Sequence, residues 1–200
     1  MRAEMPIVKR PEELDKAPVL RIENYLWLEG YTPEVTARGV YVENKGFLIE
    51  MKCPEKFPKA VYTERDSPVC RDSCMEFFVN FSPETDGRYI NFEANARGAL
   101  HCKIGPGRGN RVPLASLDIP QPELTAWVEE DSWSIRLFVP LGCIAALYGR
   151  TEFHRGDRFR ANFYKCGDET ETPHYGAWNF IDLPSPDFHR PEFFGEIELT

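Results

Sequence analysis

The sequence predicts an all-β domain, and three observations support this prediction. Apolar and polar residues alternate at a spacing of two in several segments, 17 prolines and 14 glycines separate those segments, and 42% of the 200 residues are hydrophobic. Alternation at period two is typical of strands that turn one face toward a core. We therefore expect many short strands around one core, with at most one or two short helices.

A single domain over residues 1–200 fits the length of the chain. All-β domains of roughly 200 residues are common, and no linker-like stretch divides the sequence. The first third shows no regular alternation and is expected to be irregular. Six cysteines are scattered along the chain, and a domain of this size does not need disulfides to fold, so we expect reduced and mostly buried thiols.

The net charge of −8 excludes nucleic acid as the expected partner, because binding to phosphates needs clustered Lys and Arg. The longest apolar runs are far shorter than the roughly 20 residues that cross a bilayer, so we expect a soluble protein without a membrane partner. Residues 1–10 contain no apolar stretch of signal-peptide length. This favours the cytoplasm for the chain as given, and an extracellular location for a chain from which a leader has been removed.

Three predicted strands combine an apolar face with a face of compact polar groups. They lie at 74–81, 89–95 and 159–165. Their apolar faces carry Met75, Phe77, Val79, Phe81, Ile90, Phe92, Ala94, Phe159, Ala161 and Phe163. The opposite faces carry Glu76, Phe78, Asn80, Tyr89, Asn91, Glu93, Asn95, Arg160, Asn162 and Tyr164. Such faces suit either a solvated sheet surface or a ligand rich in hydroxyl groups.

Further strands are predicted at 46–53, 99–104, 125–130, 133–139 and 194–199, and a brief helix at 141–147. The glycine-rich segment 105–111 lacks the Gly-Lys-Ser/Thr ending of a phosphate-binding loop, so we interpret it as a flexible surface loop. Trp127 and Trp133 lie within alternating strands and are expected in the core, and Trp27 is expected to pack in a short apolar patch.

Several blocks of sequence resemble family 9 carbohydrate-binding modules and their DOMON-like relatives. The resemblance runs from about residue 40 to the C-terminus. It rests on Asp72-Ser73-Cys74-Met75-Glu76-Phe77-Phe78, on Tyr89-Ile90-Asn91-Phe92-Glu93-Ala94-Asn95 with Arg97-Gly98, on Arg160-Ala161-Asn162-Phe163-Tyr164, and on Phe188-His189-Arg190-Pro191-Glu192-Phe193-Phe194-Gly195. It implies a DOMON-like, jelly-roll-like β-sandwich of two antiparallel sheets that binds carbohydrate without catalytic machinery. Such modules often accompany xylanases and other polysaccharide-degrading glycoside hydrolases.

The same resemblance implies where a sugar ring would stack. Members of the family that bind sugar clamp the ring between two tryptophans, and Trp178 matches the C-terminal one. Pro68-Val69-Cys70-Arg71 stands where the other is expected. Because aromatic stacking supplies much of the contact energy, loss of one ring should weaken or redirect binding. Phe78, Tyr89 or Tyr164 could replace it from the sheet, and a degenerate or altered ligand preference is equally compatible. A Trp178 packed under a loop is the alternative.

Together the residues predict a binding site for a mono- or oligosaccharide of the xylan or cellulose type. Its predicted ligand-binding residues are Glu76, Asn91, Glu93, Asn95, Arg97, Arg160, Asn162, Tyr164, His174, Trp178 and Asn179. His174 and His189 flank the Trp178 loop and either contact the sugar or stabilise the loop, and turn chemistry favours a structural role for His189 and Arg190.

Other functions are also compatible with the sequence. Glu76 and Glu93 could serve as the carboxylate pair of a glycoside hydrolase, although hydrogen bonding to hydroxyls is the more frequent role. A haem-binding DOMON-like domain with Met and His ligands is a further alternative, as is a protein-interaction domain. No cofactor is required. Asp66, Asp72 and Asp86 are candidate calcium ligands, and the Cys70/Cys74 pair lacks a matching pair at zinc-site spacing.

Overall fold

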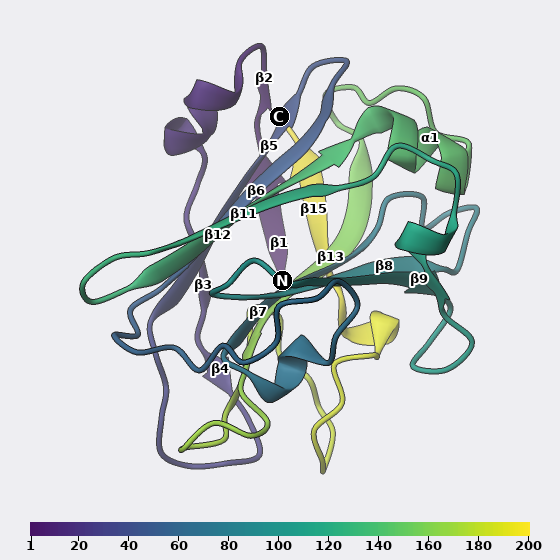
Figure 1. The fold of residues 1–200 in the computed structure, drawn as a ribbon. Coiled ribbons are helices and arrows are strands. Elements are labelled where there is room, and N and C mark those ends of the chain that lie inside the picture. The colour runs from purple at the N-terminus through teal and green to yellow at the C-terminus, as the bar shows by residue number, and fades with distance from the viewer.

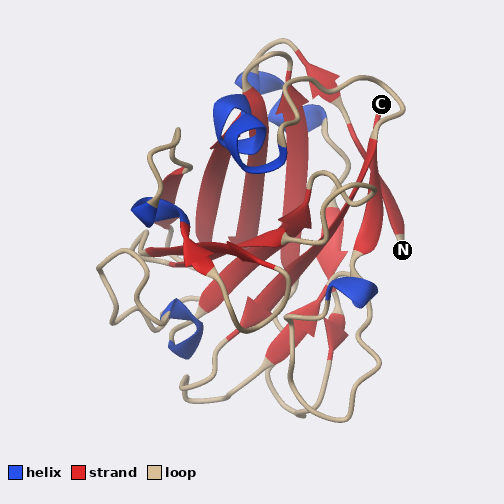
Figure 2. Cartoon of the chain, turned by 90° about the vertical axis from the view of Figure 1, so that its right-hand side faces the viewer, coloured by secondary structure: helices blue, strands red, loops and turns tan.

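The computed structural model describes residues 1–200 as two β-sheets packed face to face (Figures 1 and 2). The large sheet has nine strands in the order β1-β15-β13-β7-β8-β9-β10, with β14 paired to β13 and β4 paired to β14. The small sheet has six, in the order β11-β12-β6-β5-β2, with β3 paired to β5. All pairs are antiparallel except β1 with β15 and β2 with β5. The predicted all-β sandwich is confirmed.

The large sheet consists of β1 (Arg2–Met5), β4 (Asn24–Tyr25), β7 (Cys74–Asn80), β8 (Tyr89–Asn95), β9 (Leu100–Gly105), β10 (Val112–Pro113), β13 (Arg158–Cys166), β14 (Tyr175–Ala177) and β15 (Gly195–Leu199). The small sheet consists of β2 (Ile7–Val8), β3 (Leu20–Ile22), β5 (Val35–Val42), β6 (Gly46–Cys53), β11 (Glu123–Val128) and β12 (Trp133–Pro140). The helices are α1 (Leu141–Tyr148) and the short 3-10 turns η1 (Pro11–Lys16), η2 (Val69–Arg71), η3 (Leu114–Ser116) and η4 (Pro191–Phe193).

The predicted strands after residue 45 are all present, within a few residues of their expected ends. The expectation of an irregular first third is wrong, because β1 to β5 lie there. The longest of these, β5, packs against apolar clusters on both faces: Val35, Ala37 and Tyr41 point into the main core, while Val40 and Val42 pack in a small cluster with Leu14 of η1. Thr36 and Arg38 alternate with buried Val35 and Ala37, but residues 39–42 are buried on both faces, so the polar alternation is lost in the second half of the strand.

The brief predicted helix is α1, which follows β12 directly. It begins after Pro140 and ends at Gly149, whose φ of 71° is left-handed and whose N–H donates to the Ala145 carbonyl at 2.8 Å. Glycine adopts this conformation without steric cost, so it stops the helix after two turns. No helix of the chain is of a length and apolarity that would carry it across a membrane.

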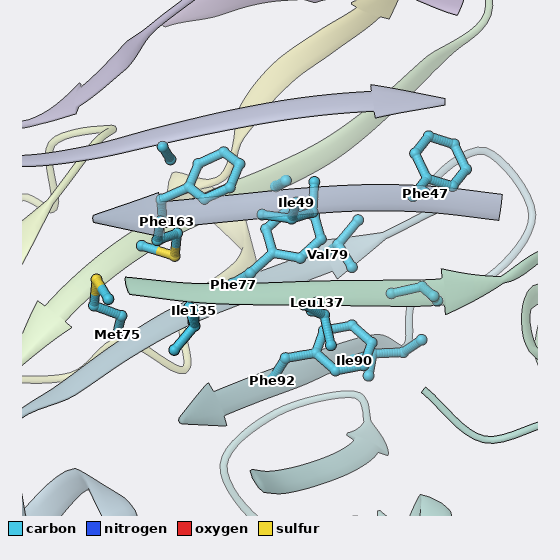
Figure 3. Close-up of a cluster of buried hydrophobic side chains, with 14 of the residues drawn as sticks. Phe47, Ile49, Met75, Phe77, Val79, Ile90, Phe92, Ile135, Leu137 and Phe163 are labelled. Atoms are coloured by element: carbon cyan, nitrogen blue, oxygen red, sulfur yellow. The ribbon is translucent and has the colours of Figure 1, made fainter. Parts of the chain in front are cut away.

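The main core fills the space between the sheets. Figure 3 shows Phe77 and Val79 of β7 meeting Ile49 of β6 and Leu137 of β12 from the opposite sheet, with Met75 of β7 nearer Ile135 of β12. The cluster contains 34 buried residues, including Trp133 at 0% exposure as predicted. Trp127 differs from its prediction. It lies on the outer face of the small sheet, half-buried, with the Arg136 guanidinium 5.6 Å from its ring centre.

A second apolar cluster covers the outer face of the large sheet. It contains Val69, Cys74, Phe78, Tyr89, Ala99, Tyr164, Cys166, Ala177, Ile181, Phe188 and Phe194. The segment after β14, which lies below β7 in Figure 1, supplies Ile181, Phe188 and Phe194. The large sheet is therefore buried on both faces, and the face that the alternation assigned to solvent or ligand is mostly covered by chain.

Candidate functional site

One cavity opens through this cover onto the outer face of the large sheet, with a volume of about 160 Å³. Its floor comes from β7, β8 and β13, which supply Glu76, Phe78, Glu93 and Cys166. Its walls are formed by Cys70, Arg108, Asp168, Tyr175, Pro186, Asp187, Phe188 and His189. Rigid strands thus hold the floor, and loops from four parts of the chain surround it.

The floor holds two carboxyl groups side by side. Glu76 and Glu93 are direct cross-strand partners in the β7–β8 register, and their exposures are only 3% and 6%. Burial raises the pKa of Glu76 well above its usual range, and the neighbouring Glu93 raises this pKa further. Burial also raises the pKa of Glu93, against an opposing effect of His101. Two buried like charges repel each other, so this floor favours a ligand that donates hydrogen bonds or carries positive charge.

Side chains behind the floor fix Glu93 in place. Asn91 donates from Nδ2 to Glu93 Oε1 at 2.7 Å, and Arg111 donates from Nη2 to Asn91 Oδ1 at 2.5 Å. The Arg111 guanidinium lies 4.3 Å from the centre of the Tyr89 ring. The predicted ligand residue Asn91 is 1% exposed and therefore acts through Glu93 rather than at the cavity surface.

Aromatic rings form the apolar wall of the cavity. Phe188 stacks on Tyr164 at 4.1 Å with an angle of 8° between the ring planes, which makes the predicted residue Tyr164 a support for the wall. Tyr175 is the half-exposed ring of the wall and meets Phe188 edge-on at 6.1 Å. Trp27 packs behind both, at 5.9 Å from Tyr175 and 6.0 Å from Phe188, as the predicted packing role implies.

The rim is closed by an ion pair between two distant loops. Arg108 donates to Asp187 Oδ1 at 2.7 Å, and the same oxygen accepts from the His189 backbone N–H at 3.0 Å. The 105–111 loop thus contributes to the site, which the prediction of a surface loop did not include. His189 shares a hydrogen bond of 2.8 Å with the Tyr89 hydroxyl. Burial, together with Arg111 and Arg108, lowers the pKa of His189 to about 3, so the imidazole is neutral.

Trp178 does not reach this cavity. Its side chain is 4% exposed and belongs to the main core, where it meets Phe163 edge-on at 6.0 Å. It also packs over Gly195, where an added methyl group would lie 2.7 Å from Trp178 Cη2. The prediction of an exposed stacking ring at Trp178 is wrong, and the alternative of a ring packed under a loop is the structure observed.

Most other predicted ligand residues hold the protein together instead. Asn95 donates to Tyr62 O and Asp72 Oδ2 and accepts from the backbone of Arg97 and Ala99. Asn162 donates to Asn179 O and accepts from its N–H. Arg160 donates to the Phe194 carbonyl. Asn179 donates to the Phe193 carbonyl and accepts from the Met1 amino group. Arg97 is exposed and lies outside the cavity. Glu76 and Glu93 are the predicted residues that line the site.

His174 belongs to a buried network at the edge of the main core. The three donors of the Lys165 ammonium go to Ser73 Oγ at 2.9 Å, Cys166 O at 3.0 Å and His174 Nε2 at 2.6 Å. Glu55 accepts from Ser73 and from Trp133 Nε1, the latter at 2.9 Å, and lies 3.8 Å from Lys165. Every donor of this buried lysine is satisfied, which identifies His174 as a structural residue.

The candidate calcium ligands do not form a common site. Asp72 accepts from the Val61 and Tyr62 backbone, Asp66 accepts from the Cys102 N–H, and Asp86 pairs with Arg88. The set of metal-binding side chains that the fold does bring together is Cys74, Glu76 and Cys166.

The Met and His ligands of the haem alternative are also apart. Met5, Met51 and Met75 lie in the main core, whereas His189 lines the cavity on the other side of the large sheet. His189 therefore does not form an axial pair with any of these three methionines.

A β-sandwich whose covered sheet carries a small cavity with buried carboxyl groups and an aromatic wall has the architecture of a sugar-binding module. The chain belongs to carbohydrate-binding family 9, whose family model matches residues 8–199, and it is accordingly a non-catalytic carbohydrate-binding module.

Solved structures agree with this fold. A proposed carbohydrate-binding protein from Bacteroides uniformis ATCC 8492 shares 26% identity and superposes with a TM-score of 0.82, over 100% of this chain and 99% of the other. Family 9 modules from Caldicellulosiruptor kristjanssonii, solved with cellotriose and with glucose, are both 8% identical with TM-scores of 0.70, over 100% of this chain and 93% and 96% of theirs. No curated protein matches the sequence.

Proposed function

We propose that the cavity on the outer face of the large sheet is the sugar site, and that it takes one terminal pyranose of a cellulose- or xylan-type chain. The observation that carries the proposal is the adjacent Glu76 and Glu93 pair at the floor of a cavity of about 160 Å³. Buried carboxyl groups accept hydrogen bonds from hydroxyl groups, and neighbouring hydroxyls of a pyranose present two such donors together. The cellotriose and glucose in the two Caldicellulosiruptor kristjanssonii structures support this ligand class.

Tyr175 is the ring on which the sugar stacks in this proposal. It is the half-exposed aromatic of the wall, whereas Phe78 at 1% and Phe188 at 8% exposure offer little free surface. The Arg108–Asp187 pair closes the rim, which limits the cavity to a monosaccharide or a chain end rather than the middle of a chain. At roughly −0.3 kcal/mol for each of about a dozen heavy atoms, the expected Kd is millimolar.

Titration of the protein with glucose, xylose, cellobiose and xylobiose tests the proposal. Tyr175→Ala should weaken binding about tenfold, because a stacked aromatic contributes roughly 1 kcal/mol beyond its buried area. Glu93→Gln should weaken it by a similar factor, because one of the two adjacent carboxyl groups that receive the sugar hydroxyls is lost. Arg108→Ala should also weaken binding, with the exposed Arg97→Ala as its matched control. Unchanged affinity in both Tyr175→Ala and Glu93→Gln would refute this location of the site.

The family resemblance supports an accessory role beside a glycoside hydrolase. Fusion of the chain to a xylanase should raise the rate on insoluble xylan and leave the rate on soluble xylan unchanged, because the module only concentrates the enzyme at its substrate. The same fusion carrying Glu93→Gln is the control. An equal rate with both fusions on insoluble xylan would contradict this role.

A further inference from the structure

The pairing of β7 with β13 brings two cysteines and a glutamate together beneath the cavity. Cys74 and Cys166 are direct cross-strand partners, and Glu76 lies two residues along β7 on the same face. Met75, labelled in Figure 3, points the opposite way into the main core. The two sulfur atoms and a Glu76 carboxylate oxygen all lie within 4.8 Å of one another. Within this group, Cys166 Sγ donates to Glu76 Oε1 at 3.0 Å.

The Glu76 carboxyl group has weak partners for so buried a group. Cys166 is its one hydrogen-bond donor, and a thiol is a poor donor. A second carboxyl group, that of Glu93, stands beside it on the neighbouring strand. A carboxyl group that is 3% exposed, accepts from one thiol and stands beside a second carboxyl group is an environment in which a bound cation would stabilise the carboxylate form.

The chemistry of the three groups selects the cation. Thiolates and a carboxylate are ligands of Zn²⁺ and similar thiophilic ions, whereas calcium and magnesium prefer oxygen alone. The neighbouring ligand atoms of a tetrahedral zinc site are about 3.3 to 3.8 Å apart, given bonds near 2.0 Å to oxygen and 2.3 Å to sulfur. A group of three such atoms already within 4.8 Å needs only small side-chain movements to reach that geometry.

The site has an entrance. Glu76 and Cys166 line the cavity, so an ion can reach them from solvent. Cys70 lines the same cavity. Neither Cys102 nor Cys143 has this arrangement, because both thiols lie in the main core on the other side of the large sheet.

We propose that Cys74, Glu76 and Cys166 bind one thiophilic divalent cation, Zn²⁺ or an ion of similar chemistry, at the floor of the cavity. The two thiols lose their protons to solvent when the ion binds, so the bound site carries two thiolates, one carboxylate and the metal charge. This proposal does not depend on the sugar proposal, since it uses no property of a sugar ligand.

Cobalt titration of the reduced protein tests this site directly. One equivalent of Co²⁺ should produce the near-ultraviolet thiolate-to-cobalt charge-transfer absorption and the visible bands of a tetrahedral ion, and one equivalent of Zn²⁺ should abolish both. A thiol count before the titration should give six free thiols. Proton release measured in weak buffer should accompany binding.

Variants assign the absorption to the three residues. Cys74→Ser and Cys166→Ser should each reduce the charge-transfer intensity by about half and weaken binding at least tenfold, because each removes one thiolate. Glu76→Gln should weaken binding and keep the charge-transfer band. Cys143→Ser, which removes a buried thiol from α1, is the matched control and should bind as the wild type does. Absence of the charge-transfer band in the folded wild-type protein would overturn the proposal, as would its survival in the Cys74→Ser/Cys166→Ser double variant.

Discussion

Trp178 departs from the role that sequence chemistry suggests for it, whereas Trp27 packs as expected but does so beside the cavity. Trp178 stands among polar and turn residues, yet its ring fills the space over Gly195 in the main core. Trp27 comes from an apolar patch near the N-terminus, yet it backs the cavity wall beside Tyr175 and Phe188. Local composition does not report depth, because the depth of a side chain depends on which distant segment covers it.

Trp178→Ala is expected to act on stability. Removing a buried ring leaves a cavity in the main core, and the expected cost is about 3 to 5 kcal/mol of the free energy of unfolding. Urea denaturation measures this loss, and Trp127→Ala on the outer face of the small sheet is the control. A stable Trp178→Ala protein with only its sugar affinity lost would contradict the structure.

Trp27→Phe is expected to act on the fluorescence signal. Trp27 is the tryptophan in contact with the cavity wall, so its replacement should remove the sugar-dependent change in emission and leave the Kd within about threefold. The hydrogen bond from Trp27 Nε1 to Leu183 O, 2.7 Å long, is lost with it, at a cost of about 1 kcal/mol of stability. Persistence of the full emission change in Trp27→Phe would place the signal elsewhere.

Among the elements, β13 is buried on both faces and carries a buried charged residue. Its outward residues support the cavity floor, and its inward residue Lys165 sits at 0% exposure at the edge of the main core. The alternation that predicts this strand also places Lys165 on its apolar face. A lysine on an apolar face indicates a buried ionic network, which the residue type alone would not indicate. The partner Glu55 comes from a loop far away in the sequence and His174 from the loop that follows β13, and no alternation pattern indicates either contact.

Lys165→Met should destabilise the protein by about 3 to 5 kcal/mol. It removes the cation from a buried group of polar side chains and leaves Glu55 and Ser73 without their partner. Lys9→Met, at an exposed position, is the matched control and should change stability by less than about 0.5 kcal/mol. Equal midpoints of urea unfolding for both variants would show that the network contributes nothing.

Sequence patterns are informative for some elements of this fold and silent for others. Strands with one polar face, such as β8, can be predicted with their correct ends, because apolar and polar residues alternate along their whole length. β5 is hidden because its second half, residues 39–42, is buried on both faces and breaks the alternation. Glu76 and Glu93 could be found because each lies on a strand whose register brings them together. The walls, from Arg108 to His189, depend on contacts between loops that lie far apart in the sequence.

At the scale of the whole molecule, buried neutral histidines make stability depend on pH. Burial lowers the pKa of His174 to about 4, below the 6.5 of an exposed imidazole. Between about pH 6.5 and 4 the unfolded chain therefore binds a proton at this histidine that the folded chain does not bind. The free energy of unfolding is highest above about pH 6.5 and falls as the pH drops toward 4. The expected loss from His174 is of the order of 1 to 3 kcal/mol.

Urea unfolding at several pH values between 7.5 and 4.5 measures this dependence. His174→Gln should flatten the profile, because glutamine can still accept a hydrogen bond from Lys165 and does not titrate. His154→Gln, at an exposed histidine, should leave the profile as it is in the wild type. A His174→Gln profile as steep as that of the wild type would rule out this source of acid sensitivity.

The large sheet has an apolar cluster on each of its faces, so its central strands are shielded from solvent on both sides. Amide hydrogens of β7, β8 and β13 lie in the middle of a three-layered structure, so they should exchange with deuterium only through global unfolding, whereas β11 at the edge of the small sheet should exchange early. The floor of the cavity is then already in its final conformation before any ligand arrives. Ligand binding should slow exchange in the surrounding loops and leave the floor strands unchanged.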